Sequence, residues 1–142
     1  MDKPFLVAVD FSELTGPTLE RAATLAKGSG NRIDLVHVVP PQNMTSRGNM
    51  AAKAIAGQVA KNAEEHARRK LAPYLEQIPV AHRGEAIVKT GMAAELLCEV
   101  AGQGYEMMVL ATNGRTGLSH ALLGSVAERV VRLCPIPVLV VR

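Results

Sequence analysis

The sequence predicts a five-stranded parallel β-sheet covered by helices on both faces. Short apolar runs alternate with segments of helical periodicity along a chain of 142 residues. Apolar residues make up 48% of the chain and aromatic residues only 3%, so the core must consist mainly of aliphatic side chains. Strands buried on both faces, as in parallel sheets, have this composition. The length corresponds to a single domain spanning residues 1–142.

Two strands and a helix are predicted in the first part of the chain. Residues 5–9 and 33–39 are continuous apolar runs, and prolines at the end of the second run stop it. Between them, Pro17 suits a first helical turn and the glycines at 28 and 30 suit a helix end. The residues expected on the buried face of this helix are Leu19, Ala22, Ala23 and Ala26.

The longest predicted helix covers residues 51–71. Its expected buried stripe has apolar residues at helical spacing, namely Ile55, Val59, Ala63, Ala67 and Leu71. Pro73 is expected to end or kink this helix, because proline lacks the N–H that the helical ladder needs. The preceding residues 42–49 show no periodicity and are predicted to form a polar loop.

The second half of the chain continues the alternation. Strands are predicted at 85–90, 107–111 and 136–141, with the first of these near an edge of the sheet, and helices at 93–101 and 125–133. Strands separated by helices imply right-handed crossovers and therefore parallel pairing. The expected strand order is 3-2-1-4-5, which places the first strand beside the fourth at the switch point where open α/β sheets bind ligands.

An anion-binding motif is predicted between the fourth strand and the last helix. The chain reads Ala111-Thr-Asn-Gly114, then nine residues, then Gly124-Ser125. The N–H groups and the positive dipole end of the following helix favour a phosphate there, and glycine lets the phosphate approach the backbone. Arg115 is a further candidate for phosphate contact. Asp10, expected to face this loop across the switch point, can accept a ribose hydroxyl.

Structural roles compete with these functional ones. Asp10 can instead cap the turn or helix that follows it. Ser125 and Glu128 have the spacing of a capping box, which uses the same free N–H groups as a phosphate. Gly114 can be a simple turn glycine, because the pattern is neither a P-loop nor GxGxxG. The sequence leaves these alternatives open.

Composition argues against several function classes. The net charge is only +3, the basic residues are dispersed and aromatic residues are scarce, which disfavours nucleic-acid binding. No spacing of histidine, serine, cysteine or acidic residues suggests a catalytic set or a metal site. Cys98 and Cys134 lack metal-ligand spacing and are expected to be free thiols. With no leader or membrane-length apolar run recognised, a cytoplasmic protein is expected.

These residues together resemble the universal stress protein family. The resemblance spans the chain and rests on Leu6-Val-Ala-Val-Asp-Phe-Ser12, His37-Val38, residues 111–118 with 123–128, and the closing Cys134-Pro-Ile-Pro-Val-Leu-Val-Val141. It implies a flavodoxin-like, Rossmann-like α/β fold of the adenine nucleotide alpha hydrolase kind. It also implies a homodimer formed through the last strand, with Val138 and Val140 at the contact.

The resemblance further implies a site for ATP, with Mg²⁺ as a candidate companion. In the ATP-binding branch the motif is G-x2-G-x9-G-[ST], and here Ala111 replaces the first glycine and adds one methyl group. By resemblance, the phosphates would be held by Gly114, Gly124, Ser125 and Val126, and the ribose by Asp10. The adenine and ribose pocket would be lined by Ala8, Val9, Val38, Leu110 and Ala111.

The expected function is that of a nucleotide-dependent sensor or switch with an unidentified protein partner. A nearly complete phosphate-binding motif with no recognisable set of catalytic residues favours a switch over an enzyme that hydrolyses ATP. Two alternatives remain: a slow ATPase, for which no residue that would position a water is evident, and a dimeric interaction module without nucleotide, which the replacement at Ala111 would favour.

Overall fold

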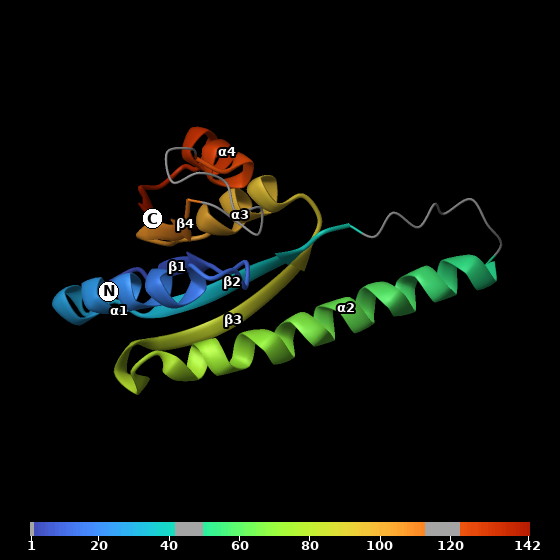
Figure 1. Cartoon of the computed structure of the whole chain (residues 1–142), viewed down its shortest axis with the longest axis horizontal. Helices are drawn as coiled ribbons and strands as arrows, with labels where there is room; N and C mark the ends of the chain where they lie inside the picture. Colours follow the sequence, from blue (N-terminus) through green and yellow to red (C-terminus); the bar gives the residue numbers. More distant parts are fainter. Residues whose placement is uncertain (1, 42–49, 113–122) are drawn as a thin grey trace.

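The computed structural model describes residues 2–41, 50–112 and 123–142. Five parallel strands form one sheet in the order β3-β2-β1-β4-β5, as the sequence predicts (Figure 1). The strands are β1 (Phe5–Ala8), β2 (Ile33–Val39), β3 (Arg83–Thr90), β4 (Met107–Ala111) and β5 (Val138–Val141). The helices are α1 (Thr15–Ser29), α2 (Met50–Gln77), the short 3₁₀ helix η1 (Val80–His82), α3 (Ala93–Ala101) and α4 (Ser125–Leu133).

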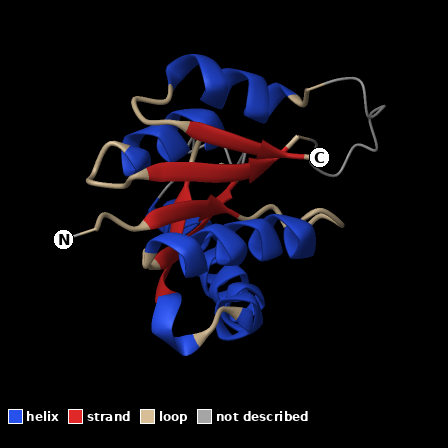
Figure 2. Cartoon of the chain, turned by 90° about the vertical axis from the view of Figure 1, so that its left-hand side faces the viewer, coloured by secondary structure: helices blue, strands red, loops and turns tan. Residues whose placement is uncertain are grey.

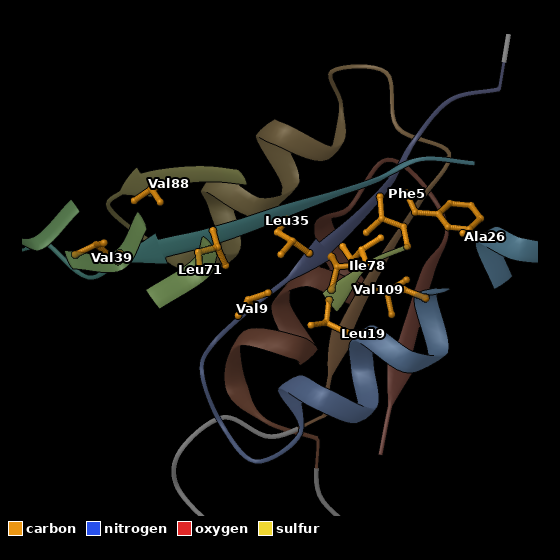
Figure 3. Packing of buried hydrophobic residues seen from close by; sticks show 14 residues of the cluster. Phe5, Val9, Leu19, Ala26, Leu35, Val39, Leu71, Ile78, Val88 and Val109 are labelled. Carbon is orange, nitrogen blue, oxygen red and sulfur yellow. The ribbon is translucent and has the colours of Figure 1, made fainter. Parts of the chain in front are cut away.

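Helices cover both faces of the sheet (Figure 2). Helices α1 and α2 contact one face, and α3 and α4 pack together on the other. Because side chains alternate along a strand, successive residues of β1 pack into two different cores. Val7 belongs to the core under α1 and α2, whereas Leu6 belongs to the core under α3 and α4. Figure 3 shows the first core, to which β2 contributes Leu35, α1 contributes Leu19 and α2 contributes Leu71.

Prolines explain two differences from the predicted element bounds. β5 begins at Val138 and not at residue 136, since Pro137 has no N–H and supplies only its carbonyl, to Met108 N–H at 2.9 Å. α2 continues past Pro73 to Gln77. A single missing N–H near the end of a long helix is offset by the packing of Leu71 and Tyr74 against the core.

The buried stripe predicted for α2 is only partly correct. Ala67 and Leu71 are buried and Ala63 is half-buried, but Ile55 is 59% exposed and Val59 is 36% exposed. The N-terminal part of α2 projects beyond the body of the fold, where no strand faces it (Figure 1). The half-buried residues in that part are alanines, at 56 and 60, which lie beside the predicted stripe and not on it. Of the helices in the described ranges, none has the length and hydrophobicity that crossing a membrane requires.

Candidate functional site

A cavity of about 410 Å³ lies at the carboxyl ends of the central strands. β1 pairs with β2 on one side and with β4 on the other, so this is the switch point of the sheet. The volume falls within the range of small-molecule sites. Nine of the residues predicted for the site line the cavity: Ala8, Val9, Asp10, Val38, Leu110, Ala111, Gly124, Ser125 and Val126. Their part in binding remains a prediction.

Two predicted residues, Gly114 and Arg115, lie outside the described residues. Gly117 and His120, in the nine-residue stretch between Gly114 and Gly124, lie outside them as well. Six further lining residues were not predicted, namely Val36, His37, Ala93, Leu97, Thr112 and Ala127. Alternation along β2 could have identified Val36, because it lies on the same face of the strand as Val38. The contributions of α3 and Ala127 depend on how the helices pack across the sheet, which no local pattern encodes.

The interior of the cavity is mainly aliphatic. Val36 and Leu110, on β2 and β4, are fully buried or nearly so, and Leu97 of α3 is 5% exposed. All three belong to the core between the sheet and helices α3 and α4. A planar apolar group is well accommodated by such a surface, since its burial removes apolar area from water on both partners.

Asp10 provides the carboxylate at the edge of the cavity. Its Oδ1 accepts a hydrogen bond of 2.9 Å from the N–H of Ser12 and one of 3.4 Å from the Thr15 hydroxyl. The alternative role of Asp10, holding the turn before α1, is therefore present. Oδ2 has no hydrogen bond to any residue in the described ranges, so the same side chain can hold its turn and accept from a ligand.

The N-terminus of α4 supplies free donors on the other side. Gly124 is the N-cap, and its carbonyl accepts the N–H of Glu128 at 2.9 Å. The capping box predicted for Ser125 and Glu128 is wrong: Ser125 is already the first helical residue, and no side chain caps α4. The Gly124 N–H donates to the carbonyl of Thr112 at 2.7 Å.

The next three amides, of Ser125, Val126 and Ala127, have no hydrogen-bond partner among the described residues. The first-turn N–H groups of a helix always lack intrahelical acceptors, and the helix dipole adds a partial positive charge there. All three residues line the cavity. Together with the aliphatic interior and Asp10, the arrangement suits a molecule with a flat apolar part, hydroxyl groups and an anionic end. The described ranges contain no group of three or more metal-ligating side chains.

A doubly wound parallel α/β sheet with a ligand-sized cavity at its switch point defines the class of this protein. The model of the universal stress protein family matches residues 1–142, and the chain belongs to that family. The universal stress protein YxiE of Bacillus subtilis is 27% identical over 158 residues, which cover all of both chains. The solved structure of the universal stress protein UspA from Lactobacillus plantarum has a TM-score of 0.79 at 16% identity, and covers 100% of this chain and 99% of that one.

Two related solved structures hold adenine nucleotides. The universal stress protein from Archaeoglobus fulgidus in complex with dAMP has a TM-score of 0.59 at 22% identity, with 99% of this chain and 98% of that chain covered. A universal stress protein in complex with cAMP has a TM-score of 0.64 at 23% identity, with 100% and 99% covered. At these identities the likeness establishes the shared fold.

Proposed function

We propose that this chain binds an adenine nucleotide, ATP with Mg²⁺, in the switch-point cavity and acts as a cytoplasmic nucleotide-dependent switch. The observation that carries the proposal is that three unpartnered amides at the N-terminus of α4 line the same cavity as the Asp10 carboxylate. An anion next to the amides gains hydrogen bonds and a favourable dipole interaction. The adenine nucleotides in two relatives of the same fold support the choice of ligand.

Each part of the ligand has a proposed set of contacts. The adenine ring would lie against the aliphatic side chains of Ala8, Val38 and Leu110, beside the backbone of Val9 and Ala111. The ribose hydroxyls would donate to Oδ2 of Asp10. The phosphates would accept from the amides of Ser125 and Val126 and from the Ser125 hydroxyl. Gly124 would contribute space, because its own N–H is already used by Thr112. Gly114 and Arg115, which lie outside the described residues, remain proposed phosphate contacts because of their positions in the sequence motif.

The proposed assembly is a homodimer through β5. Val138 and Val140 are half-buried on an edge strand, whose free side can pair with a second copy. Light scattering after gel filtration tests this. Replacing both valines by threonine keeps β-branched side chains in the strand but makes the contact polar. We expect a dimer mass for the unmodified chain and a monomer mass for the double variant; a monomer mass for the unmodified chain would refute the dimer.

Thermal unfolding with and without MgATP tests the binding proposal. A ligand at about one hundred times its dissociation constant adds roughly 2.7 kcal/mol to the free energy of unfolding. For a domain of this size, each kcal/mol raises Tm by about 2–4 °C. Dideoxyadenosine triphosphate and GTP serve as comparison ligands for the ribose and the base.

Gly124→Asp is the matched control variant. Aspartate is a good N-cap residue, so the variant should fold, while its carboxylate repels a phosphate at the same place. We expect MgATP to raise Tm of the unmodified chain and to leave Tm of the variant unchanged. Equal shifts in both would place any nucleotide elsewhere. No shift in either would favour the interaction module.

A further inference from the structure

Phe11, the residue directly after Asp10, has a left-handed backbone with φ of 61°. Within the described ranges it is the single residue other than glycine with a positive φ. A β-carbon is crowded in this region, so a bulky residue keeps the conformation only where its surroundings impose it. The contacts that hold Phe11 in this conformation therefore also affect the placement of the neighbouring Asp10.

The Phe11 ring is held from two directions by β2 and α2. Its centroid lies 4.5 Å from that of His37 on β2 and 5.9 Å from that of Tyr74 on α2. The Lys70 ammonium, also on α2, lies 4.3 Å from the centroid of the Phe11 ring, which is a cation–π contact. Tilted rings at these separations attract each other beyond the effect of buried area. The ring is thus anchored on the face of the sheet opposite α3 and α4.

The residue before Asp10 is fixed by the same strand. The N–H of Val9 donates to the carbonyl of Val36 at 2.8 Å, and Nδ1 of His37 lies 2.6 Å from the Val9 carbonyl oxygen. His37 therefore contacts both neighbours of Asp10, through a hydrogen bond on one side and through ring packing on the other. The carboxylate has little freedom to rotate away, since its Oδ1 is also held by the N–H of Ser12.

We propose that Phe11 is a positioning residue for the ribose contact of Asp10. The anchored ring imposes the left-handed backbone, and this backbone directs Oδ2 of Asp10 to the cavity while Oδ1 closes the turn. Loss of the ring frees the turn to relax to an ordinary conformation and moves Oδ2 away from the ribose. The inference rests on the proposed nucleotide site.

The test compares three substitutions of Phe11 with two ligands by isothermal titration calorimetry. Phe11→Ala removes the ring and keeps the crowded β-carbon, Phe11→Gly removes both, and Phe11→Tyr keeps the ring. The ligands are MgATP and its 2′,3′-dideoxy analogue, which lacks the hydroxyls that Asp10 would bind. We expect the Ala and Gly variants to bind MgATP roughly tenfold more weakly, the size of a lost hydrogen bond to a charged group.

We expect the dideoxy analogue to bind the Ala, Gly and Tyr variants as it binds the unmodified chain. Phe11→Tyr should bind MgATP normally. Normal binding of MgATP by Phe11→Gly would overturn the role of the ring, because glycine can adopt the left-handed backbone but is not held in it, so Asp10 would then be placed without any anchor. Equal weakening of both ligands would mean general damage to the cavity and would also overturn the inference.

The proposed function is judged separately, by the unmodified chain alone. If that chain binds neither ligand, the nucleotide proposal fails and the inference about Phe11 fails with it. If it binds MgATP and the Phe11 variants behave as it does, only the inference fails. Circular dichroism of each variant at the titration temperature verifies that a loss of affinity does not come from unfolding.

Discussion

The N–H of Gly124 donates a hydrogen bond of 2.7 Å to the carbonyl oxygen of Thr112. Thr112 follows the last residue of β4, and Gly124 is the N-cap of α4. The N–H of Thr112 in turn donates to the carbonyl of Val141 on β5 at 2.8 Å. The start of α4 is thereby attached to the ends of two strands, which fixes the position of its free first-turn amides relative to the cavity.

Substitution of Gly124 by alanine should separate binding from stability. Gly124 has φ of −64° and ψ of 158°, which any L-residue can adopt. We expect the free energy of unfolding of the ligand-free protein to change little, because the gain of about 0.4–1 kcal/mol from restricting the unfolded chain is opposed by a loss of similar size from replacing the N-cap glycine by alanine, a poorer N-cap. The added methyl group takes space at the cavity wall and should weaken MgATP binding. Urea unfolding and calorimetry measure the two effects, and unchanged affinity would remove Gly124 from the site.

The size of the side chain at position 111 should set the affinity. Ala111 is half-buried, lines the cavity and stands where the family motif has glycine. We expect affinity for MgATP to fall in the order glycine, alanine, valine at this position. Ala111→Gly should also lower stability by about 0.5–1 kcal/mol, since glycine weakens a strand. The same affinity in all three proteins would show that the residue does not approach the nucleotide.

The buried pair of Asp34 and Tyr105 should contribute to stability away from the site. The Tyr105 hydroxyl donates to Oδ2 of Asp34 at 2.9 Å, and Glu85 N–H donates to Oδ1 at 2.8 Å. Asp34 is 5% exposed, so Tyr105→Phe leaves a buried carboxylate oxygen unpaired. We expect a loss of about 1–3 kcal/mol in urea unfolding.

Tyr74→Phe is the control for that substitution, because the Tyr74 hydroxyl has no hydrogen bond to a described residue. It should change stability by less than about 0.5 kcal/mol. Burial, followed by the hydrogen bond to Asp34, raises the pKa of Tyr105 above its usual range. The stability that the Asp34–Tyr105 pair contributes is therefore complete below pH 10, the usual pKa of tyrosine. It decreases above pH 10, because the unfolded chain loses the Tyr105 proton first. Equal losses in the two variants would contradict the account of the pair.

Cys98 should react slowly and make stability fall at high pH. Burial, followed by the neighbouring Cys134 thiol, raises the pKa of Cys98 from 9.0 to about 11. The folded state holds the Cys98 proton more tightly than the unfolded chain does. The stability that Cys98 contributes is therefore complete below pH 9 and is lost as the pH rises through 11. At pH 8 the smaller thiolate fraction should slow alkylation of Cys98 relative to the unfolded chain.

Peptide mass spectrometry of the unmodified chain treated with iodoacetamide measures the rate at Cys98 separately from that at Cys134, and keeps the Cys134 thiol beside Cys98. The Cys98→Ser protein should show a shallower fall in stability between pH 9 and pH 11 than the unmodified chain. Alkylation of Cys98 in the folded protein as fast as in the unfolded chain would contradict the assignment.

Parallel pairing was predictable from the sequence because apolar runs and helical segments alternate, and the order 3-2-1-4-5 was the expectation for a doubly wound sheet. Periodicity also identified α3 and α4 with their correct ends. The stripe on α2 was mispredicted because helical spacing shows which residues share a face, but not whether a strand lies opposite. Ile55 therefore has the right spacing and is nonetheless exposed.

At the candidate site, residues next to the strand ends could be predicted and those supplied by long-range packing could not. Asp10 and Ala111 follow from the strand order, since both stand at the carboxyl ends of adjacent strands. The capping role of Ser125 was mispredicted because the helix begins one residue earlier than a Ser125 cap requires: the Gly124 carbonyl accepts the Glu128 N–H, which makes Gly124 the N-cap. The anchor around Phe11 joins residues of three separate elements, and its left-handed backbone has no signature in a phenylalanine.

Titration of ¹⁵N-labelled protein with MgATP, followed by two-dimensional NMR, tests the central claim most directly. The account predicts that the amide signals of Ser125, Val126 and Ala127 shift most, since phosphate would accept from them, and that Asp10 shifts with them. It also predicts no such shifts in Gly124→Asp. Saturating MgATP that leaves these four amides unmoved, or that moves only residues remote from the switch point, would contradict nucleotide binding in this cavity.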